Sequence, residues 1–202
     1  MLNHRKKSKL LNRFRGLLPV VIDVETSGLN PITDALLEIA IVPISMDVAG
    51  KLVKGETSAF HIEPFIGANM DADALAITGI NPQQPLRYAI PEQQALHNVF
   101  NIIRKQLVIS GCKRGVLVGH NAWFDLAFIQ NAIKRCHLKS SPLHSFTTFD
   151  TASLSALIFG ETVLAKSVKS AGISFDINQA HSAAYDAERT ADLFCYIVNH
   201  YS

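Results

Sequence analysis

An apolar run over residues 17–24, with acidic residues at its end, is the feature that most restricts how this chain can fold. Valine and isoleucine dominate the run and Thr26-Ser27-Gly28 follows it, which predicts a buried strand stopped by a turn. Side chains two residues apart on a strand point to the same face, so Asp23 and Glu25 would face one point. The sequence therefore predicts a sheet with two carboxylates at the end of one strand.

The rest of the chain predicts two more strands and then alternating helices and strands. The two strands cover residues 35–45 and 57–62, with a turn marked by Gly50 and Gly55 between them. Helices are predicted over residues 71–78, 91–108, 151–159, 162–171 and 183–200, and from a cap at Asn121 to about residue 137. Further strands are predicted over residues 115–119 and 146–150. This order predicts an α/β fold, with a mixed sheet that opens as an antiparallel meander and carries helices on its faces.

Length and composition indicate one folded domain of ordinary size. The chain has 202 residues, of which 48% are hydrophobic and 18% charged, as in globular rather than disordered proteins. Cys112, Cys136 and Cys195 form no C-x-x-C pair, so neither a disulfide framework nor a zinc knuckle is indicated. Neither a signal peptide nor an apolar stretch of the roughly 18 residues that a membrane helix needs is predicted. A reducing cytoplasm is the expected location.

Basic residues gather at the start of the chain. Residues 1–22 carry +6, and the remainder, with 13 basic and 17 acidic residues, carries −4. The six early cations are Arg5, Lys6, Lys7, Lys9, Arg13 and Arg15. We therefore divide the chain into a basic N-terminal arm over residues 1–16 and a domain over residues 17–202. Such an arm suits contact with a polyanion, because each neutralised phosphate releases counterions, but a solvated terminus would have the same composition.

Four acidic residues and one histidine stand at four places along the chain, each at the end of a predicted element. Besides Asp23 and Glu25, Asp125 lies in the first turn of a helix, His181 precedes the last helix and Asp186 lies near its start. Each has an ordinary interpretation when taken singly, as a solvated acid, a partner of the helix dipole or a cap. Together they predict a site for Mg²⁺ or Mn²⁺. Two such ions can bind the attacking water and the leaving oxygen of a phosphodiester displacement. A histidine beside them can accept a proton near neutral pH.

The residues around these positions resemble the DEDD exonuclease superfamily, in its histidine-containing branch. Three motifs carry the resemblance: VIDVETSG over residues 21–28, HNAWFD over residues 120–125 and HSAAYD over residues 181–186. The tracts FTTFDT at residues 146–151, ETVL at 161–164 and DAERTA at 186–191 are more narrowly similar to the ribonuclease T family. The similarity runs from about residue 18 to residue 201.

That resemblance implies a ribonuclease H-like sheet flanked by helices, with the exonuclease domain over residues 17–202. It also implies two Mg²⁺ ions, with Mn²⁺ as the alternative. Asp23 would bridge the two ions, Glu25 and Asp186 would hold the first, and Asp125 would support the second, directly or through water. His181 would be the general base.

The family releases nucleoside 5'-monophosphates from single-stranded 3' ends of RNA and of DNA, and it trims the 3' ends of transfer and ribosomal RNAs. It works as a homodimer, and the resemblance implies a cytoplasmic enzyme without membrane contact. In the family, a basic patch of one subunit delivers RNA to the active site of the other. The residues of this chain that match the patch are Arg13, Arg15, Arg114 and Lys139.

The family also clamps terminal bases with several aromatic residues. Phe124 and Phe146 keep that character, whereas Leu29 and Ile77 occupy two positions of the aromatic set and cannot offer a π-face. Either this is ordinary variation in a hydrophobic slot, or the grip on the terminal base is weaker or its preference altered, since stacking contributes roughly 1 to 3 kcal/mol per base. The remaining implied substrate contacts are Thr26 and Asp73, the latter near the scissile-end phosphate.

Three alternatives stay open on the sequence. Two are also exonucleases: a proofreading type acting on DNA, and an oligoribonuclease that takes only very short RNAs. The basic arm and the tract at residues 146–151 favour the ribonuclease T family over both. The third is a catalytically silent nucleic-acid-binding module, whose usual mark is a lost ligand or a lost histidine, and this chain has lost neither.

Overall fold

A six-stranded sheet forms the centre of the computed structural model, which describes residues 9–201. Its strands are β1 (Leu17–Thr26), β2 (Leu36–Met46), β3 (Leu52–Lys54), β4 (Ser58–His61), β5 (Arg114–Gly119) and β6 (Leu143–Asp150). β1 pairs antiparallel with β2 and parallel with β5, β5 pairs parallel with β6, and β3 and β4 both pair antiparallel with β2. The predicted mixed sheet, opened by antiparallel strands, is confirmed.

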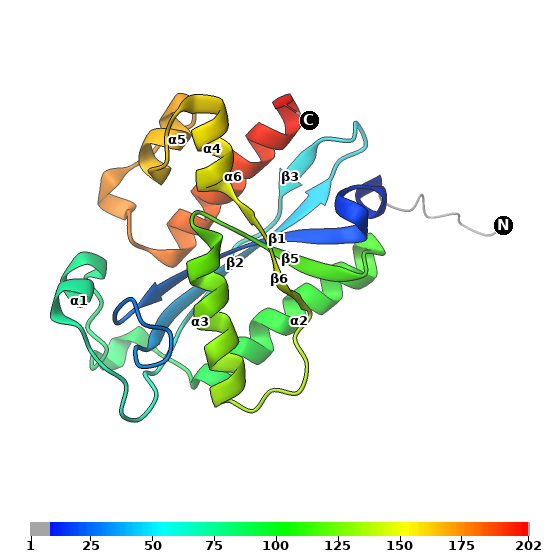
Figure 1. Cartoon of the computed structure of the whole chain (residues 1–202). Coiled ribbons are helices and arrows are strands. Elements are labelled where there is room, and N and C mark those ends of the chain that lie inside the picture. The colour runs from blue at the N-terminus through cyan, green and yellow to red at the C-terminus, as the bar shows by residue number, and fades with distance from the viewer. Residues whose placement is uncertain (1–8, 202) are drawn as a thin grey trace.

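Helices cover both faces of this sheet (Figure 1). They are α1 (Ala72–Thr78), α2 (Glu92–Ser110), α3 (Ala122–Arg135), α4 (Thr151–Phe159), α5 (Leu164–Ser170) and α6 (Ala183–Tyr201). α6 packs on one face, against β1 and β2, and α2 and α3 pack on the other. Val20, Val21 and Ile22 of β1 are fully buried because helices lie on both sides of the strand. The α/β class predicted from the order of elements is confirmed.

One strand was missed in the sequence. Residues 52–54 fall where a turn was predicted, but they form β3, in which Val53 pairs with Ser45 of β2. The buried Leu52 donates its N–H to Asn199 Oδ1 of α6 at 2.7 Å, and its carbonyl accepts from Asn199 Nδ2 at 2.9 Å. The prediction was wrong because the partners that hold this short strand are distant in the chain.

Asn121 occupies the predicted N-cap position of α3, but its side chain does not cap the helix. Asn121 stands before the helix in the left-handed region, with φ 67°, and its side chain makes no capping hydrogen bond. The carboxylate of Asp150 takes that role and accepts the N–H groups of Asn121 at 2.8 Å and Ala122 at 3.4 Å. This is possible because Gly119 and Asp150 are register partners at the ends of β5 and β6. Asparagine tolerates the left-handed conformation, which explains its presence at the turn.

Residues 9–16 lie against the domain rather than away from it. They form two short 3₁₀ turns, Lys9–Asn12 and Phe14–Gly16. Leu10 is buried in the core, and the ring of Phe14 lies 5.0 Å from that of Phe149 and 6.3 Å from that of Phe194. The rest of the predicted basic arm, residues 1–8, lies outside the described residues.

Cys112, Cys136 and Cys195 are free. Across residues 9–201, no helix combines the length and the apolar character needed to cross a membrane.

Candidate active site

The four predicted acidic residues line one pocket of about 430 Å³ at the carboxyl end of β1. Asp23 and Glu25 reach it from β1, Asp125 from the first turn of α3 and Asp186 from the first turn of α6. The structure thus brings together side chains that are more than a hundred residues apart. An acidic pocket at strand ends is where ligands gather in open α/β sheets.

Asp125 is held at the end of β1 by the backbone of that strand. The ladder between β1 and β5 ends at the pair Val21–Val118. Beyond it, the N–H of Val24 donates to Asp125 Oδ1 at 3.1 Å, so the carboxylate replaces a strand partner. Gly119 permits this approach, since a Cβ there would lie only 3.0 Å from Asp125 Oδ2. The helix-dipole interpretation of Asp125 therefore does not account for its position, which is buried and directed to β1.

Asp186 and His181 are linked at the start of α6. Asp186 Oδ2 accepts the backbone N–H of His181 at 3.0 Å, in the manner of a capping side chain that reaches back over the first turn. His181 has φ 63°, a conformation that costs energy for a side chain other than glycine. Its ring is exposed, and ligand atoms of Glu25, His181 and Asp186 all lie within 4.8 Å of one another. The histidine therefore stands beside the carboxylates.

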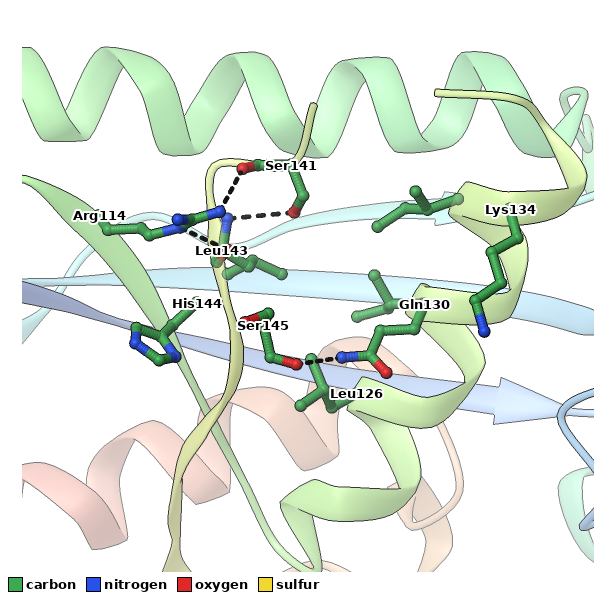
Figure 2. A pocket seen from close by; sticks show the side chains of 10 residues that line it. Arg114, Leu126, Gln130, Lys134, Ser141, Leu143, His144 and Ser145 are labelled. Atoms are coloured by element: carbon green, nitrogen blue, oxygen red, sulfur yellow. Dashed lines mark hydrogen bonds between the residues drawn. The ribbon is translucent and has the colours of Figure 1, made fainter. Parts of the chain in front are cut away.

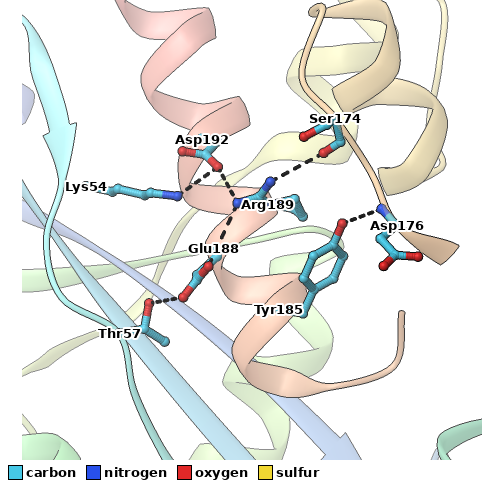
Figure 3. Close-up of polar contacts among 8 residues, drawn as sticks. All are labelled: Lys54, Thr57, Ser174, Asp176, Tyr185, Glu188, Arg189 and Asp192. Atoms are coloured by element: carbon cyan, nitrogen blue, oxygen red, sulfur yellow. Dashed lines mark hydrogen bonds and ion pairs between the residues drawn. The ribbon is translucent and has the colours of Figure 1, made fainter. Parts of the chain in front are cut away.

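The loop that carries His181 is tied back to α6 (Figure 3). The Tyr185 hydroxyl accepts the N–H of Asp176 at 2.5 Å, and Arg189 Nη1 donates to the carbonyl of Ser174 at 3.3 Å. The Arg189 guanidinium also lies over the Tyr185 ring, 5.2 Å from its centroid. The position of His181 therefore depends on contacts made by α6 as well as on the turn itself.

Burial raises the pKa values of all four carboxyl groups, and repulsion among them adds to this at Asp23 and Glu25. For Asp23 burial is the larger cause, and repulsion from Asp125, Glu25, Asp186 and Glu38 adds to it. Burial, with repulsion from Asp186 and Glu38, raises the pKa of Glu25 to about 8. Burial also raises the pKa of Asp125 and that of Asp186, against the lowering effect of backbone hydrogen bonds. A cluster of this kind favours a bound cation over four uncompensated charges.

Glu38 is a further acid near the site that the sequence did not single out. It is the register partner of Glu25 on β2, and it pairs with His61 of β4 at 2.8 Å. Like charges directly opposite on neighbouring strands repel, so the ion pair with His61 offsets part of that repulsion when His61 is protonated. The only local sign of Glu38 was an acid inside the apolar run of the second predicted strand.

His120 lines the same pocket and connects it to the loop before α5. Its Nε2 donates to the carbonyl of Thr162 at 2.7 Å, and its Nδ1 lies 3.0 Å from the hydroxyl of Thr151. Burial lowers the pKa of His120, which favours the neutral ring. His120 belongs to the second motif, but no local pattern in the sequence indicates these contacts.

The donor set fits a hard divalent cation. Asp186 Oδ1 is buried and has no hydrogen-bond partner among the described residues, so it is free to act as a ligand. The other donors are carboxylate oxygens and one histidine nitrogen, and oxygen-rich sets suit Mg²⁺ or Mn²⁺ better than softer metals. The residues present therefore fit a divalent metal ion.

The predicted substrate contacts are divided between the pocket and its surroundings. Leu29, 81% exposed, and Phe124 line the pocket. Ile77, 63% exposed, and Asp73 lie on α1, which borders the end of β1 but does not line the pocket. Thr26 is buried, and its hydroxyl donates to the carbonyl of Gly28 at 2.6 Å, so this side chain serves the turn.

Phe146 is carried outward by an irregularity in β6. Leu143 pairs with Gly115 and Thr148 with Leu117, so the intervening residues of β6 form a bulge. His144 Nδ1 accepts the N–H of Thr147 at 3.1 Å inside this bulge, and its ring packs edge-on against that of Phe146 at 4.6 Å. Phe146 is 79% exposed as a result.

The predicted basic patch lies at the other end of β1 from the acidic pocket. Arg15 is exposed just before the strand, and Arg114, the first residue of β5, pairs with Leu17. Asp23 lies six residues beyond Leu17 along β1, and at the rise of a strand this spacing corresponds to roughly 20 Å. The remaining patch residues are Arg13, over the ring of Phe14, and Lys139, exposed after α3. One chain therefore separates its basic residues from its own acidic pocket.

Arg114 stands at the rim of a groove of about 250 Å³ between α3 and β6 (Figure 2). Its Nε donates to the carbonyl of Leu143 at 2.8 Å and its Nη2 to that of Ser141 at 3.4 Å. Lys134 adds a further cation at this groove that the sequence did not single out. Arg114 thus orders the loop before β6 in addition to contributing charge.

Comparison with known proteins gives the family. A family model described as exonuclease, that of ribonuclease T, matches residues 20–194, a range that contains all three motifs. This chain belongs to the ribonuclease T family of exonucleases. Ribonuclease T of Escherichia coli (strain K12) is 52% identical over 199 residues, which cover 98% of this chain and 93% of that relative. Ribonuclease T of Shigella flexneri gives the same values.

Solved structures share the fold of this ribonuclease T family member. Escherichia coli exonuclease I in complex with a dT13 oligonucleotide has a TM-score of 0.68 and 19% identity, over 90% of this chain and 41% of that chain. A full-length 3'-exonuclease has a TM-score of 0.71 and 16% identity, over 90% of this chain and 60% of that chain. The sheet and its helices are thus those of the exonuclease fold, which confirms the predicted ribonuclease H-like class.

We expect this ribonuclease T family member, when free of metal, to lose stability as the pH rises. The pKa of Glu25 is about 8 in the fold and 4.5 ordinarily, so over this interval the folded state holds a proton that the unfolded state releases. The free energy of unfolding then falls with rising pH across that window. A bound cation compensates the same charges, so the gain in melting temperature from Mg²⁺ should grow from about pH 5 to about pH 8.

Thermal unfolding in EDTA and in Mg²⁺, followed across this pH range, measures both trends. The matched variant Glu25→Gln should flatten the pH dependence in EDTA. A melting temperature that is independent of pH in EDTA, or an Mg²⁺ effect of equal size at every pH, would contradict the expectation.

Proposed function

We propose that the chain is a 3'-to-5' exoribonuclease that removes nucleoside 5'-monophosphates from single-stranded 3' ends by metal-dependent hydrolysis. The observation that carries the proposal is the convergence of Asp23, Glu25, Asp125 and Asp186 on one pocket with His181 beside it. This complete set speaks against a catalytically silent module, because four buried or partly buried carboxylates with raised pKa values would otherwise destabilise the fold.

Each residue has a part in the proposed reaction. Asp23 would hold both divalent ions, Glu25 and Asp186 would hold the first, and Asp125 would support the second, directly or through water. Such ions, Mg²⁺ or Mn²⁺, supply positive charge at the phosphodiester and make its attacking water more acidic. His181 accepts the proton of that water, which attacks the last phosphodiester. The P–O3' bond breaks, the oxygen of the water stays on the released nucleoside 5'-monophosphate, and the freed 3'-oxygen takes a proton from solvent to become the 3'-hydroxyl of the shortened strand.

RNA is the favoured substrate because the relatives that share half of their residues with this chain are named ribonuclease T. Trimming of transfer RNA and other stable RNAs follows from the same relationship. Single-stranded DNA is a second substrate, since the neighbour exonuclease I was solved with a dT13 oligonucleotide. A proofreading-type DNA exonuclease and an oligoribonuclease are the remaining alternatives. Free cysteines suit a cytoplasmic enzyme.

An assay on end-labelled oligomers tests this function. With Mg²⁺, we expect stepwise loss of terminal nucleotides from a transfer RNA-like stem with a single-stranded 3' overhang, and EDTA should abolish it. A blunt duplex and an RNA blocked at its 3' end serve as controls. Equal activity on blunt DNA would favour the proofreading alternative, activity confined to very short RNAs would favour the oligoribonuclease, and no metal-dependent loss on any substrate would refute the enzyme.

The basic patch serves the active site of a second copy of the chain in this proposal. Arg15 and Arg114 stand roughly 20 Å along β1 from Asp23, so they are poorly placed to hold the same short overhang that enters the pocket. A homodimer in which two copies are related by twofold symmetry can bring the patch of one to the pocket of the other. The dimer thereby completes the substrate path.

Mixed subunits test the dimer directly. Asp23→Asn keeps the patch and loses the site. The double variant Arg15→Gln with Lys139→Gln keeps the site and weakens the patch at two of its four residues, both exposed. Mixing the two should restore roughly one quarter of the unsubstituted activity, because half of randomly paired dimers contain one complete path. A mixture no more active than its separate components, or a monomeric solution mass, would contradict the dimer role.

A further inference from the structure

Trp123 stands at the acidic pocket with most of its side chain exposed. It lies in the first turn of α3, and its indole is 68% exposed although the neighbours Ala122 and Asp125 are buried. The apolar face of α3 that packs on the sheet consists of Ala122, Leu126, Phe128, Ile129 and Ala132, and Trp123 is not part of it. Packing within the chain therefore does not account for a large aromatic side chain at this place.

We propose that Trp123 is a base-stacking residue of the active-site pocket, for a nucleobase next to the scissile phosphodiester. The inference rests on the proposed function, because it takes a single-stranded nucleic acid as the substrate. Trp123 lines the same pocket as Asp23, Glu25 and Leu29, so its indole borders the space that the end of the strand must occupy.

The rings of Trp123 and Phe124 face different directions in the pocket. Their centroids are 5.8 Å apart and their planes meet at 89°, so the two rings do not present parallel faces to one base. Phe124 also packs against Phe128, at 4.9 Å, which anchors it to the core of the helix. The exposed indole therefore offers a π-face in a direction that Phe124 does not cover.

Trp123 also supplies an aromatic face, which the aliphatic side chains of Leu29 and Ile77 lack. Leu29 lines the pocket but is aliphatic, and Ile77 lies outside the pocket lining on α1. A base that enters between Leu29 and α3 can thus find its aromatic partner at Trp123 rather than at the aliphatic positions. Stacking on an aromatic side chain contributes about 5- to 150-fold in affinity per base.

A protein interface is the competing explanation, since exposed aromatic side chains also mark docking surfaces. The position of Trp123 at the acidic pocket argues against a protein interface. The pocket walls include the carboxylates of Asp23, Glu25 and Asp186, and a partner that covered the indole would block the entrance of the substrate to them. The concave, mixed polar and apolar pocket fits a nucleotide better than a protein surface.

Trp123 is the only tryptophan of the chain, so its fluorescence reports the proposed contact without any substitution at that position. The experiment uses full-length Asp23→Asn protein with Mg²⁺, which keeps a single-stranded oligoribonucleotide uncleaved. We expect saturable quenching of the tryptophan emission, with a midpoint equal to that of binding measured by anisotropy of the 5'-labelled oligomer. Binding by anisotropy with unchanged emission would overturn the proposal.

Substitution provides the second measurement. In the catalytically intact protein, Trp123→Leu should raise KM for single-stranded RNA about 5- to 150-fold and leave kcat within a few-fold, while Trp123→Phe should keep part of the affinity. Tyr201→Leu, an exposed aromatic residue at the far end of α6, is the matched control and should change neither. Unchanged KM for Trp123→Leu, or a loss of dimer mass without a loss of oligomer affinity, would overturn the stacking role.

The exoribonuclease activity and the stacking role of Trp123 are tested by different outcomes. If the unsubstituted protein shows no metal-dependent release of nucleotides, the proposed function fails, whatever the emission does. If it is active but its emission does not respond to bound oligomer, only the assignment of Trp123 fails.

Discussion

Asp23→Asn should reduce kcat on single-stranded RNA by about 10³-fold or more, since bridging charge at the metal ions is expected to contribute several kcal/mol to transition-state stabilisation. Asparagine has nearly the same shape, so the backbone of β1 should be undisturbed. The loss should be chemical rather than structural. Burial raises the pKa of Asp23, and repulsion from Asp125, Glu25 and Asp186 raises it further.

The same substitution should stabilise the metal-free protein at alkaline pH. Removing one charge from a repelling cluster lowers the electrostatic cost of folding, so the melting temperature of Asp23→Asn in EDTA should exceed that of the unsubstituted protein near pH 8. In Mg²⁺ the order should reverse, because the variant binds the cation less tightly. Single-turnover kinetics measure the loss of activity, and thermal unfolding in EDTA and in Mg²⁺ measures the two changes in melting temperature.

Asp47→Asn is the matched control for this result, since Asp47 is an exposed acid in the turn between β2 and β3. It should leave both turnover and the Mg²⁺ dependence of the melting temperature nearly unchanged. Retention of more than a tenth of kcat by Asp23→Asn would remove Asp23 from the metal site.

His181→Ala should lower kcat at neutral pH by about 10²- to 10⁴-fold, the usual range for loss of a general base, with a smaller effect on KM. The imidazole is exposed and stands within 4.8 Å of the Glu25 and Asp186 ligand atoms, so it can meet a water at the phosphodiester. The residual activity should increase with pH, because hydroxide ion then replaces the water that has lost its base. A pH–rate profile of kcat for both proteins measures this.

Two further variants separate the chemistry of His181 from its position. Tyr185→Phe removes the hydroxyl that holds Asp176, which loosens the loop that carries His181 but keeps the imidazole itself. It should cost less than His181→Ala and should keep the shape of the pH profile. His97→Ala, at an exposed histidine of α2, should have no effect. Near-normal turnover of His181→Ala at neutral pH would end its assignment as the base.

Periodic elements were the part of the fold that the sequence predicted well. The helix predicted over residues 151–159 is observed as α4 with the same bounds, and Gly111 ends α2 in the left-handed conformation, with φ 74°. These features are set by neighbours in the chain, by the spacing of apolar side chains and by the conformational freedom of glycine. The same holds for the apolar run of β1 and the two acids at its end.

Contacts between distant segments were beyond such local patterns. β3 exists because Asn199 of α6 holds Leu52, and the start of α3 is capped by Asp150 from the next strand rather than by Asn121. Nothing near residues 52 or 121 in the chain reveals these partners. The exposure of Trp123 was equally hidden, because a tryptophan in an amphipathic helix is more commonly buried.

The sequence by itself determined the class of fold, the acidic character of one strand end and the family, because periodicity and motif spacing are properties of the chain. Only the tertiary structure decided that Asp125 and Asp186 share the pocket of Asp23 and Glu25. The same holds for Glu38, which is paired with His61 and lies opposite Glu25, and for the predicted basic patch at the opposite end of β1. These are consequences of strand order and helix packing, which bring together residues far apart in sequence. The shift of the Glu25 pKa to about 8 also depends on the tertiary structure, because burial and neighbouring charges cause it.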